Sequence, residues 1–311
     1  MRDLVKILSE CRGGEEIDLS GETIEPFYMR GSNAPQFEEP VTLAGAKCLV
    51  PSEAFMPFRF DGARGLRLVD WEISGTDRTS VGLMLHTCKN IELLRPRISG
   101  VSHAVNHNMC DHLSVLEPHC WNVRVDGIRG GGASNLTIAD GRFWDFFHED
   151  GDHSDPIQGW TLPGSSNSNL RILRNRYDRG EGHPSQGIFL RGTYPNRPQF
   201  GTVEVSGNQV SGASYNGIAV MGVTDGQVLN NHVHMLNNTK SWLRVDDYIG
   251  EVAGNIAPHF STADDRLRAI FPAKNTLENI PLPPIKSEAE QEIRTIVVRP
   301  GEQVLIVGEN R

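Results

Sequence analysis

A short motif that recurs about every 23 residues is the feature that most constrains what this chain can fold into. The motif is a small or polar residue followed by alternating apolar residues, and copies start at Gly65, Asn90, His112, Asn135, Asn169, Gly201, Gly226 and Gly250. The turn after each copy aligns through Trp71, Pro96, Pro118, Gly141, Asn175, Asn208, Asn231 and Asn255, at intervals of 22 to 25 residues except for two of 34 and 33. A period of this length is typical of one coil of a solenoid.

A second short strand lies between successive copies of the motif. Such segments start at Gly82, Ala104, Pro156, Gly187, Gly217 and Trp242. Each coil therefore carries at least two strands, whose alternate residues point inward. A leucine-rich repeat has a similar period, but it would place a helix or a longer leucine ladder in each unit, and no helical periodicity is visible here. With 32 glycines and 18 prolines to form turns, the chain is predicted to be an all-β parallel β-helix.

Both ends of a solenoid need a cover, because open coils expose strand edges and apolar side chains. Residues 1–14 are predicted to form an N-terminal cap, with a helix that presents Leu4, Ile7, Leu8 and Cys11 on one face. The solenoid is expected to span residues 1–257 together with this cap. Residues 258–311 are expected to form a C-terminal helix and hairpin cap or an oligomerisation tail, with a Pro-rich break at 281–284 and the hairpin between about 295 and 307.

Charge and composition argue against several functions. The formal net charge is −9 and no cluster of Lys and Arg is interleaved with aromatic residues, so nucleic acid is not expected as a partner. The chain contains no apolar run long enough for membrane insertion, and its first residues lack the order of a signal peptide. Five cysteines without CxxC spacing argue against a zinc site. Cys88 and Cys110 should lie one coil apart, and reduced thiols are favoured over a disulfide.

The capping helix, the entry segment Gly13–Leu19 and the Asn-Leu-x-Ile coils with their stacked asparagines resemble the pectin-lyase-like superfamily. That superfamily includes polysaccharide lyases, uronan epimerases, glycoside hydrolases and bacteriophage tailspikes. The resemblance covers about residues 1–257 and implies a right-handed parallel β-helix that acts on or binds polysaccharide. The string from Asp152 to Gln158 looks like active-site segments of this superfamily, whereas the Asp-Pro-His-Asp order of alginate epimerases is absent.

Two consecutive coils, 141–175 and 175–208, are about ten residues too long, and the excess must leave the solenoid as loops. These loops are predicted to form the walls of a groove. The first contains the ionisable run His148–Asp155, and the second adds His183 and its neighbours. Between them, Gln158, Trp160, Phe189 and Arg191 should point outward on adjacent strands.

The groove supplies the candidate site residues. Candidate catalytic residues are Asp152, His153, Asp155, His183 and Arg191; candidate substrate-binding residues are Gln158, Trp160, Gln186, Phe189, Tyr194 and Arg197; and Glu149 and Asp150 are candidate calcium ligands. A hydrolase would use two of the carboxylates of Asp150, Asp152 and Asp155. A lyase or epimerase would use His153 or His183 as base with Arg191, and a calcium-dependent enzyme would add Asp152 and Asp155 as ligands. The remaining histidines, His103 among them, are scattered over turns and are expected to be structural.

The sequence thus favours a protein that binds and degrades an acidic capsular or cell-surface polysaccharide, as a lyase or a glycosidase, with no cofactor or with Ca²⁺. Without an export signal, a virion component of the tailspike type is favoured over a secreted enzyme, and a homotrimer or contacts with other virion proteins stay open. Two alternatives remain. The protein could be a spike or adhesin that only binds glycan or another structural protein, and the acidic loop could be a solvated turn.

Overall fold

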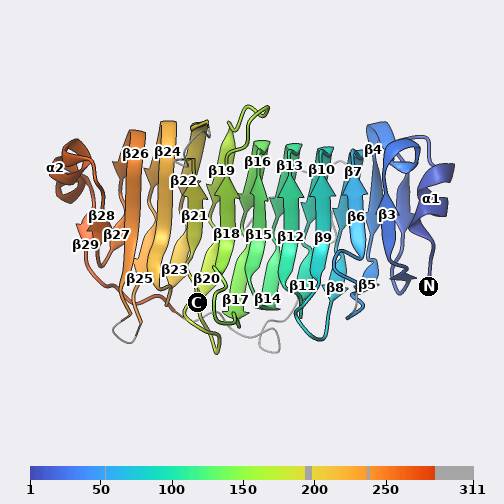
Figure 1. The fold of residues 1–311 in the computed structure, drawn as a ribbon, viewed down its shortest axis with the longest axis horizontal. Helices are drawn as coiled ribbons and strands as arrows, with labels where there is room; N and C mark the ends of the chain where they lie inside the picture. The colour runs from blue at the N-terminus through green and yellow to red at the C-terminus, as the bar shows by residue number, and fades with distance from the viewer. Residues whose placement is uncertain (53, 193–197, 237–238, 284–311) are drawn as a thin grey trace, which may run out of the picture.

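The computed structural model describes residues 1–52, 54–192, 198–236 and 239–283, and within them the chain winds in successive coils along one long axis (Figure 1). Three ladders of parallel strands run along this axis. In the described residues, a sheet of 18 strands contains two of the ladders and a sheet of 11 strands forms the third. The parallel β-helix predicted from the repeat is confirmed.

Most coils contribute one strand to each ladder, whereas β24 (Tyr215–Leu229) and β26 (Ser241–Ala253) each run through the first two ladders. The first ladder contains β3 (Phe27–Met29), β6 (Phe58–Asp61), β9 (Val81–His86), β12 (His103–Asn108), β15 (Asp126–Gly131), β18 (Asp155–Trp160), β21 (Ile188–Arg191), the first parts of β24 and β26, and β28 (Phe260–Ser261). The second contains β1 (Glu16–Asp18), β4 (Gln36–Ala44), β7 (Arg64–Val69), β10 (Lys89–Leu94), β13 (Asp111–Leu116), β16 (Ser134–Ala139), β19 (Leu170–Leu173), β22 (Phe200–Ser206) and the later parts of β24 and β26.

The third ladder has shorter strands, and the sequence pattern did not reveal it. It contains β2 (Thr23–Ile24), β5 (Lys47–Leu49), β8 (Glu72–Ser74), β11 (Arg97–Ser99), β14 (His119–Val123), β17 (Arg142–Phe146), β20 (Arg176–Asp178), β23 (Gln209–Ser211), β25 (His232–His234), β27 (Ile256–Ala257) and β29 (Thr276–Leu277). The 3₁₀ turn η1 (Gly31–Asn33) lies between β3 and β4.

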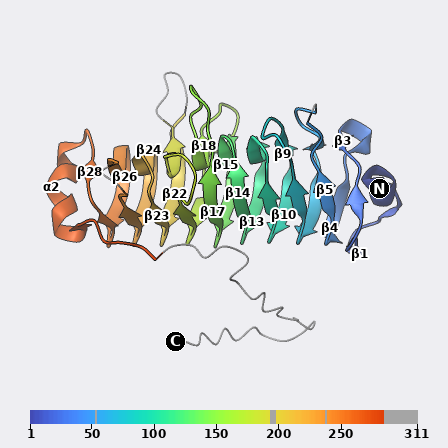
Figure 2. The same ribbon diagram turned by 90° about the horizontal axis from the view of Figure 1, so that it is seen from below.

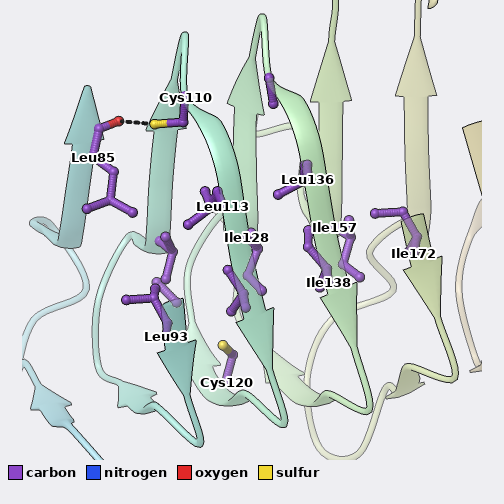
Figure 3. Packing of buried hydrophobic residues seen from close by; sticks show 14 of the residues in the cluster. Leu85, Leu93, Cys110, Leu113, Cys120, Ile128, Leu136, Ile138, Ile157 and Ile172 are labelled. Atoms are coloured by element: carbon purple, nitrogen blue, oxygen red, sulfur yellow. Dashed lines mark hydrogen bonds between the residues drawn. The ribbon is translucent and has the colours of Figure 1, made fainter. Parts of the chain in front are cut away.

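The core is the inside of the coils, because alternate residues of every strand point inward and are apolar. The parallel register places each inward residue on its equivalent in the next coil, as in the pairs Leu113 with Leu136 and Ile128 with Ile157. Figure 3 shows these buried side chains stacked in rows. The five cysteines are free thiols, and Cys110 lies in this interior with its Sγ atom directed at the carbonyl oxygen of Leu85.

A buried ladder of asparagine side chains stabilises the turn before the third ladder. The Oδ1 atom of Asn208 accepts from the backbone N–H of Asn175 at 2.9 Å. The backbone N–H of Asn208 donates in turn to Oδ1 of Asn231 at 2.9 Å. The same contacts continue to Asn255 and then to Asn275, which the repeat had not included. The predicted asparagine stack is therefore present, and it extends one coil further than expected.

A helix covers each end of the described solenoid (Figures 1 and 2). Helix α1 (Leu4–Glu10) is capped by Asp3 and buries Leu4 and Leu8, as predicted for the N-terminal cap. Helix α2 (Asp265–Lys274) buries Leu267 and Phe271 at the other end.

The coils continue beyond residue 257, because β28 pairs with β26 and β29 pairs with β27. The expected hairpin at about 295–307 lies outside the described residues. Among those that are described, no helix is long and apolar enough to cross a membrane.

We expect Asn208→Ala to lower the free energy of unfolding by about 2 to 4 kcal/mol, because it removes the acceptor of the buried N–H of Asn175 and the amide that donates to the carbonyl of Ile172. Chemical denaturation measures the change. The matched control is Gln209→Ala, since the neighbouring Gln209 side chain is exposed on the outer surface. Equal losses in the two variants would contradict a stabilising role for the ladder.

Candidate active site

A cavity of about 660 Å³ lies on the outer face of the first ladder, where β12, β15 and β18 begin. Outward-facing side chains of this ladder, including Arg129, Gln158 and Phe189, form its floor. Loops that precede the strands form its walls, and these contribute Phe55, Thr79 and the segment 151–153. The groove wall expected from residues 148–155 is therefore present, but Phe55 and Thr79 come from coils that the repeat did not single out.

Ion pairs and one ring contact hold the long loop 147–154 in place. Arg124, in the turn between β14 and β15, contacts Oδ2 of Asp152 at 2.9 Å and Oε2 of Glu149 at 3.1 Å. The guanidinium of Arg78, from the loop before β9, lies 5.0 Å from the ring centre of Phe147. The loop is thus attached to two earlier coils, so that it bends over the cavity floor.

His153 and Asp155 form a hydrogen-bonded pair at the centre of this wall. Asp155, the first residue of β18, is fully buried, whereas 52% of the His153 side chain is exposed. Oδ2 of Asp155 lies 2.7 Å from Nδ1 of His153 and accepts from Nε2 of Gln158 at 2.7 Å. Burial raises the pKa of Asp155. The hydrogen bond between His153 and Asp155 raises the pKa of His153. The ring of Phe189 meets the imidazole edge to face at 5.1 Å.

Two further ionisable side chains occupy the same strand position on the preceding coils. His103 pairs in register with Asp126, and Asp126 with Asp155. Oδ1 of Asp126 accepts from the backbone N–H of Asp155 at 2.9 Å, and Oδ2 accepts from Arg129 at 3.1 Å. Burial, with a smaller effect of the Asp155 charge, raises the pKa of Asp126.

His103 is neutral in this arrangement. Burial, and next the charge of Arg129, lower the pKa of His103 to about 3. Arg129 can only donate, so Nε2 of His103 accepts from it at 2.8 Å and Nδ1 donates to Oγ of Ser102 at 3.1 Å. The sequence had favoured a structural role for His103 and had not singled out Asp126. His103 and Asp126 could have been found from the sequence because they occupy, in the two preceding coils, the strand position that Asp155 occupies in its own.

The outward side chains predicted for substrate binding lie on adjacent strands as expected. Gln158 pairs in register with Phe189, and Trp160 with Arg191. Gln158, Phe189 and Arg191 line the cavity. The Trp160 ring lies 5.1 Å from the guanidinium carbon of Arg129, so a cation sits over its face.

Gln186 connects the pair to later coils. Its Nε2 atom lies 2.6 Å from Nε2 of His153, and its Oε1 atom accepts from Asn216. Oδ1 of Asn216 in turn accepts from the indole N–H of Trp242 at 2.8 Å. Asn216 and Trp242 had not been identified as site residues.

Other candidates lie apart from the His153–Asp155 pair. His183 is exposed, and its Nδ1 atom contacts the carbonyl oxygen of His148 at 2.9 Å rather than the cavity. The hydrogen bond with Arg124 lowers the pKa of Asp152. Glu149 and Asp150 are exposed. In the described ranges, no group of three or more His, Cys, Asp or Glu side chains is arranged to hold a metal ion. Tyr194 and Arg197 lie outside the described residues.

The two long loops nevertheless lie on the same side of the solenoid. The backbone N–H of His183 donates to the carbonyl of Phe146 at 2.7 Å, and that of Gln186 donates to the carbonyl of Ser154 at 2.9 Å. The geometric condition for a shared groove is thus met by the described part of the second loop.

No family model matches the chain, and no curated protein matches its sequence. Among solved structures, it is similar to a polygalacturonase from Erwinia carotovora ssp. carotovora, with 13% identity, a TM-score of 0.46, and coverage of 83% of this chain and 76% of the other. It is also similar to the A-module of mannuronan C-5 epimerase AlgE6 from Azotobacter vinelandii, with 12% identity, a TM-score of 0.45, and coverage of 84% of this chain and 81% of the other. For the Dettilon tailspike protein the identity is 10% and the TM-score is 0.38, with coverage of 78% of this chain and 57% of the other. The chemistry of the site therefore has to be argued from its own residues.

The buried carboxyl of Asp126 should make stability depend on pH. Because its pKa in the folded protein is raised, the folded state binds a proton more tightly than the unfolded state. The contribution of Asp126 to the free energy of unfolding therefore falls as the pH rises above about 4, the ordinary pKa of Asp, through the folded-state pKa.

We expect Asp126→Asn to remove this fall, so that the melting temperature of the variant declines less than that of the wild type over this pH range. Thermal unfolding at a series of pH values measures it. Asp140→Asn is the matched control, because Asp140 is an exposed partner of Arg174. A slope in Asp126→Asn identical to that of the wild type would refute the expected protonation.

Proposed function

We propose that this protein cleaves an acidic polysaccharide by eliminating the glycosidic bond next to a uronic acid, with His153 as the base. The observation that carries the proposal is the half-exposed imidazole of His153 in the cavity wall, with a buried carboxyl behind it. A base held by a carboxyl group in this way is suited to taking a proton from a bound substrate. The cavity also contains Arg129 and Arg191, whose positive charge suits a substrate carboxylate.

A hydrolase with two working carboxylates is less well supported. Such an enzyme needs two carboxyl groups that both reach the scissile bond. Asp155 is fully buried behind His153, and Asp152 is paired with Arg124. Asp150 is exposed on the loop and is not among the residues that line the cavity. The described carboxylates therefore offer no accessible pair.

The shape of the site supports a polymeric substrate. The cavity lies on the side of a long solenoid, and the first ladder continues past it toward both ends (Figure 1). The edge of the largely buried Phe189 lines the cavity, the half-buried Trp160 lies on the same strand as Gln158, and Gln158 supplies an amide that can bind hydroxyl groups. An extended sugar chain can lie along such a surface with several units in contact.

The reaction balances without a cofactor. Nε2 of His153, which faces away from Asp155, takes the proton from the carbon that carries the substrate carboxylate, once the substrate has displaced the Gln186 amide from it. The electron pair of that C–H bond forms the carbon–carbon double bond as the bond to the leaving sugar oxygen breaks. The leaving oxygen then takes up a proton from water or from the imidazolium. Arg191 and Arg129 stabilise the negative charge that builds up on the carboxylate, and Asp155 stabilises the imidazolium.

We expect His153→Ala to lower the rate of cleavage by about 10²- to 10⁴-fold, the usual contribution of a general base. The assay incubates the protein with a panel of acidic capsular and cell-surface glycans and records the ultraviolet absorbance of unsaturated uronate ends. His183→Ala is the matched control, because this histidine lies on a neighbouring loop but outside the cavity lining. It should keep nearly the full rate.

Two outcomes would reject the elimination mechanism. One is a His153→Ala variant that is as active as the wild type. The other is a wild type that binds an acidic glycan from the panel without producing unsaturated ends. The second result would leave the groove as a binding site of a spike or adhesin.

A further inference from the structure

We propose that Trp242 fixes the tautomer of His153 from three coils away, through a one-way chain of hydrogen bonds that we name the amide chain. The amide chain consists of Trp242, Asn216, Gln186, His153 and Asp155. Asn216 and Trp242 are register partners on β24 and β26, and Gln186 lies two residues before the start of β21 at Ile188. The inference concerns the protein without substrate, and only its use in proton transfer depends on the proposed function.

The direction of the amide chain is set at its far end. An indole N–H can only donate, so the atom of Asn216 that lies 2.8 Å from it must be the oxygen. The nitrogen of the same amide therefore faces Gln186 and donates to its oxygen. As a result, the nitrogen of Gln186 faces His153.

This direction determines which imidazole nitrogen carries the hydrogen. The Gln186 nitrogen lies 2.6 Å from Nε2 of His153 and has only hydrogens to offer, so Nε2 must accept with its lone pair. The hydrogen of the neutral ring is therefore on Nδ1, where it donates to Oδ2 of Asp155 at 2.7 Å. The acceptor Asp155 beside Nδ1 and the NH₂ group of Gln186 beside Nε2 thus both select the tautomer with hydrogen on Nδ1.

The amide chain also opposes a second proton on His153. A hydrogen at Nε2 would meet the NH₂ group of Gln186. If Gln186 turned its amide, its NH₂ group would meet that of Asn216, and if Asn216 also turned, its NH₂ group would meet the indole N–H of Trp242. Every arrangement of the protonated state loses one hydrogen bond.

The surroundings keep these groups in place. Asn216 is buried, and the Trp242 ring packs edge to face against Tyr215 at 5.5 Å. The charged groups that act on the imidazole are Asp155, which contacts it, and Asp126 on the preceding coil, and both favour the protonated ring. The ring of Phe189 covers another side without adding charge. Nε2 of Gln158 lies 3.2 Å from Nδ1 of His153 and donates to Oδ2 of Asp155 at 2.7 Å. Gln186 is thus the neutral contact at Nε2 that counteracts two carboxyl groups.

Trp242 is therefore a positioning residue. It keeps Nε2 of His153 free of hydrogen, and it opposes the imidazolium ion that the neighbouring carboxyl groups favour. Under the proposed function, this tautomer leaves the lone pair on Nε2, which becomes available to a substrate proton when the substrate displaces the Gln186 amide.

The test is a long-range ¹⁵N–¹H spectrum of the full chain labelled at its 11 histidines, with the His153 signals assigned by their loss in His153→Gln. In the wild type above the pKa of His153, we expect hydrogen on Nδ1 and a bare Nε2. In Trp242→Phe the aromatic ring stays but the donor is lost, so both amides can turn. We expect signals of a ring protonated at Nε2 and a rise of about 0.5 to 1 unit in the pKa of His153.

Tyr215→Phe is the matched control, because it alters the ring that packs against Trp242 without removing a member of the amide chain. It should leave the tautomer and the pKa of His153 as they are in the wild type. A wild-type ring with hydrogen on Nε2 would overturn the proposal, even if Trp242→Phe failed to fold. An unchanged tautomer and pKa in a folded Trp242→Phe would also overturn it. The spectrum contains no glycan, so its outcome is independent of whether the protein cleaves one.

Discussion

The structure depends on one constraint, which is that each coil of backbone pairs in parallel register with the next at the spacing of hydrogen-bonded strands. This register turns a sequence period into rows of equivalent side chains. Inside the coils the rows are apolar and form the core, and at one turn they form the asparagine ladder. On the outer face of the first ladder the same rule aligns His103, Asp126 and Asp155. The core and the candidate site are therefore two results of one geometry.

The site differs from the rest of the outer surface because loops cover it. Most ion pairs on the coils, such as Arg95 with Asp70, are well exposed and contribute little to stability. The pair Asp126 and Asp155 is buried, since the loop 147–154 lies over that part of the ladder. Burial separates these carboxyls from water, so their hydrogen-bond partners determine their behaviour. The long loop 147–154 thus buries polar side chains that would otherwise lie on the outer surface of the first ladder.

Much of the fold could be predicted from the sequence, because apolar alternation and turn residues directly reflect inward and outward directions. The outward direction of Gln158 and Phe189 on adjacent strands followed from that alternation. The burial of Leu4 and Leu8 followed from their spacing along one face of a helix. The third ladder was missed because most of its strands have only two or three residues, too few to show alternation.

The site was harder to predict, since contacts between distant coils decide it. Nothing in the acidic run shows that Asp152 is paired with Arg124 while Asp155 is buried. The role of Trp242 depends on a sequence of contacts across three coils, which no local pattern encodes.

The asparagine ladder ends at Asn275, the residue that follows α2, and it provides the partner for the backbone N–H of Asn255. From Gly141 to Asn275, each coil is in this way secured by the one after it. Thermal opening should then start at the termini and proceed coil by coil, so that the middle of the molecule opens last. The cavity occupies those middle coils, and its arrangement of hydrogen bonds would outlast partial fraying at either end.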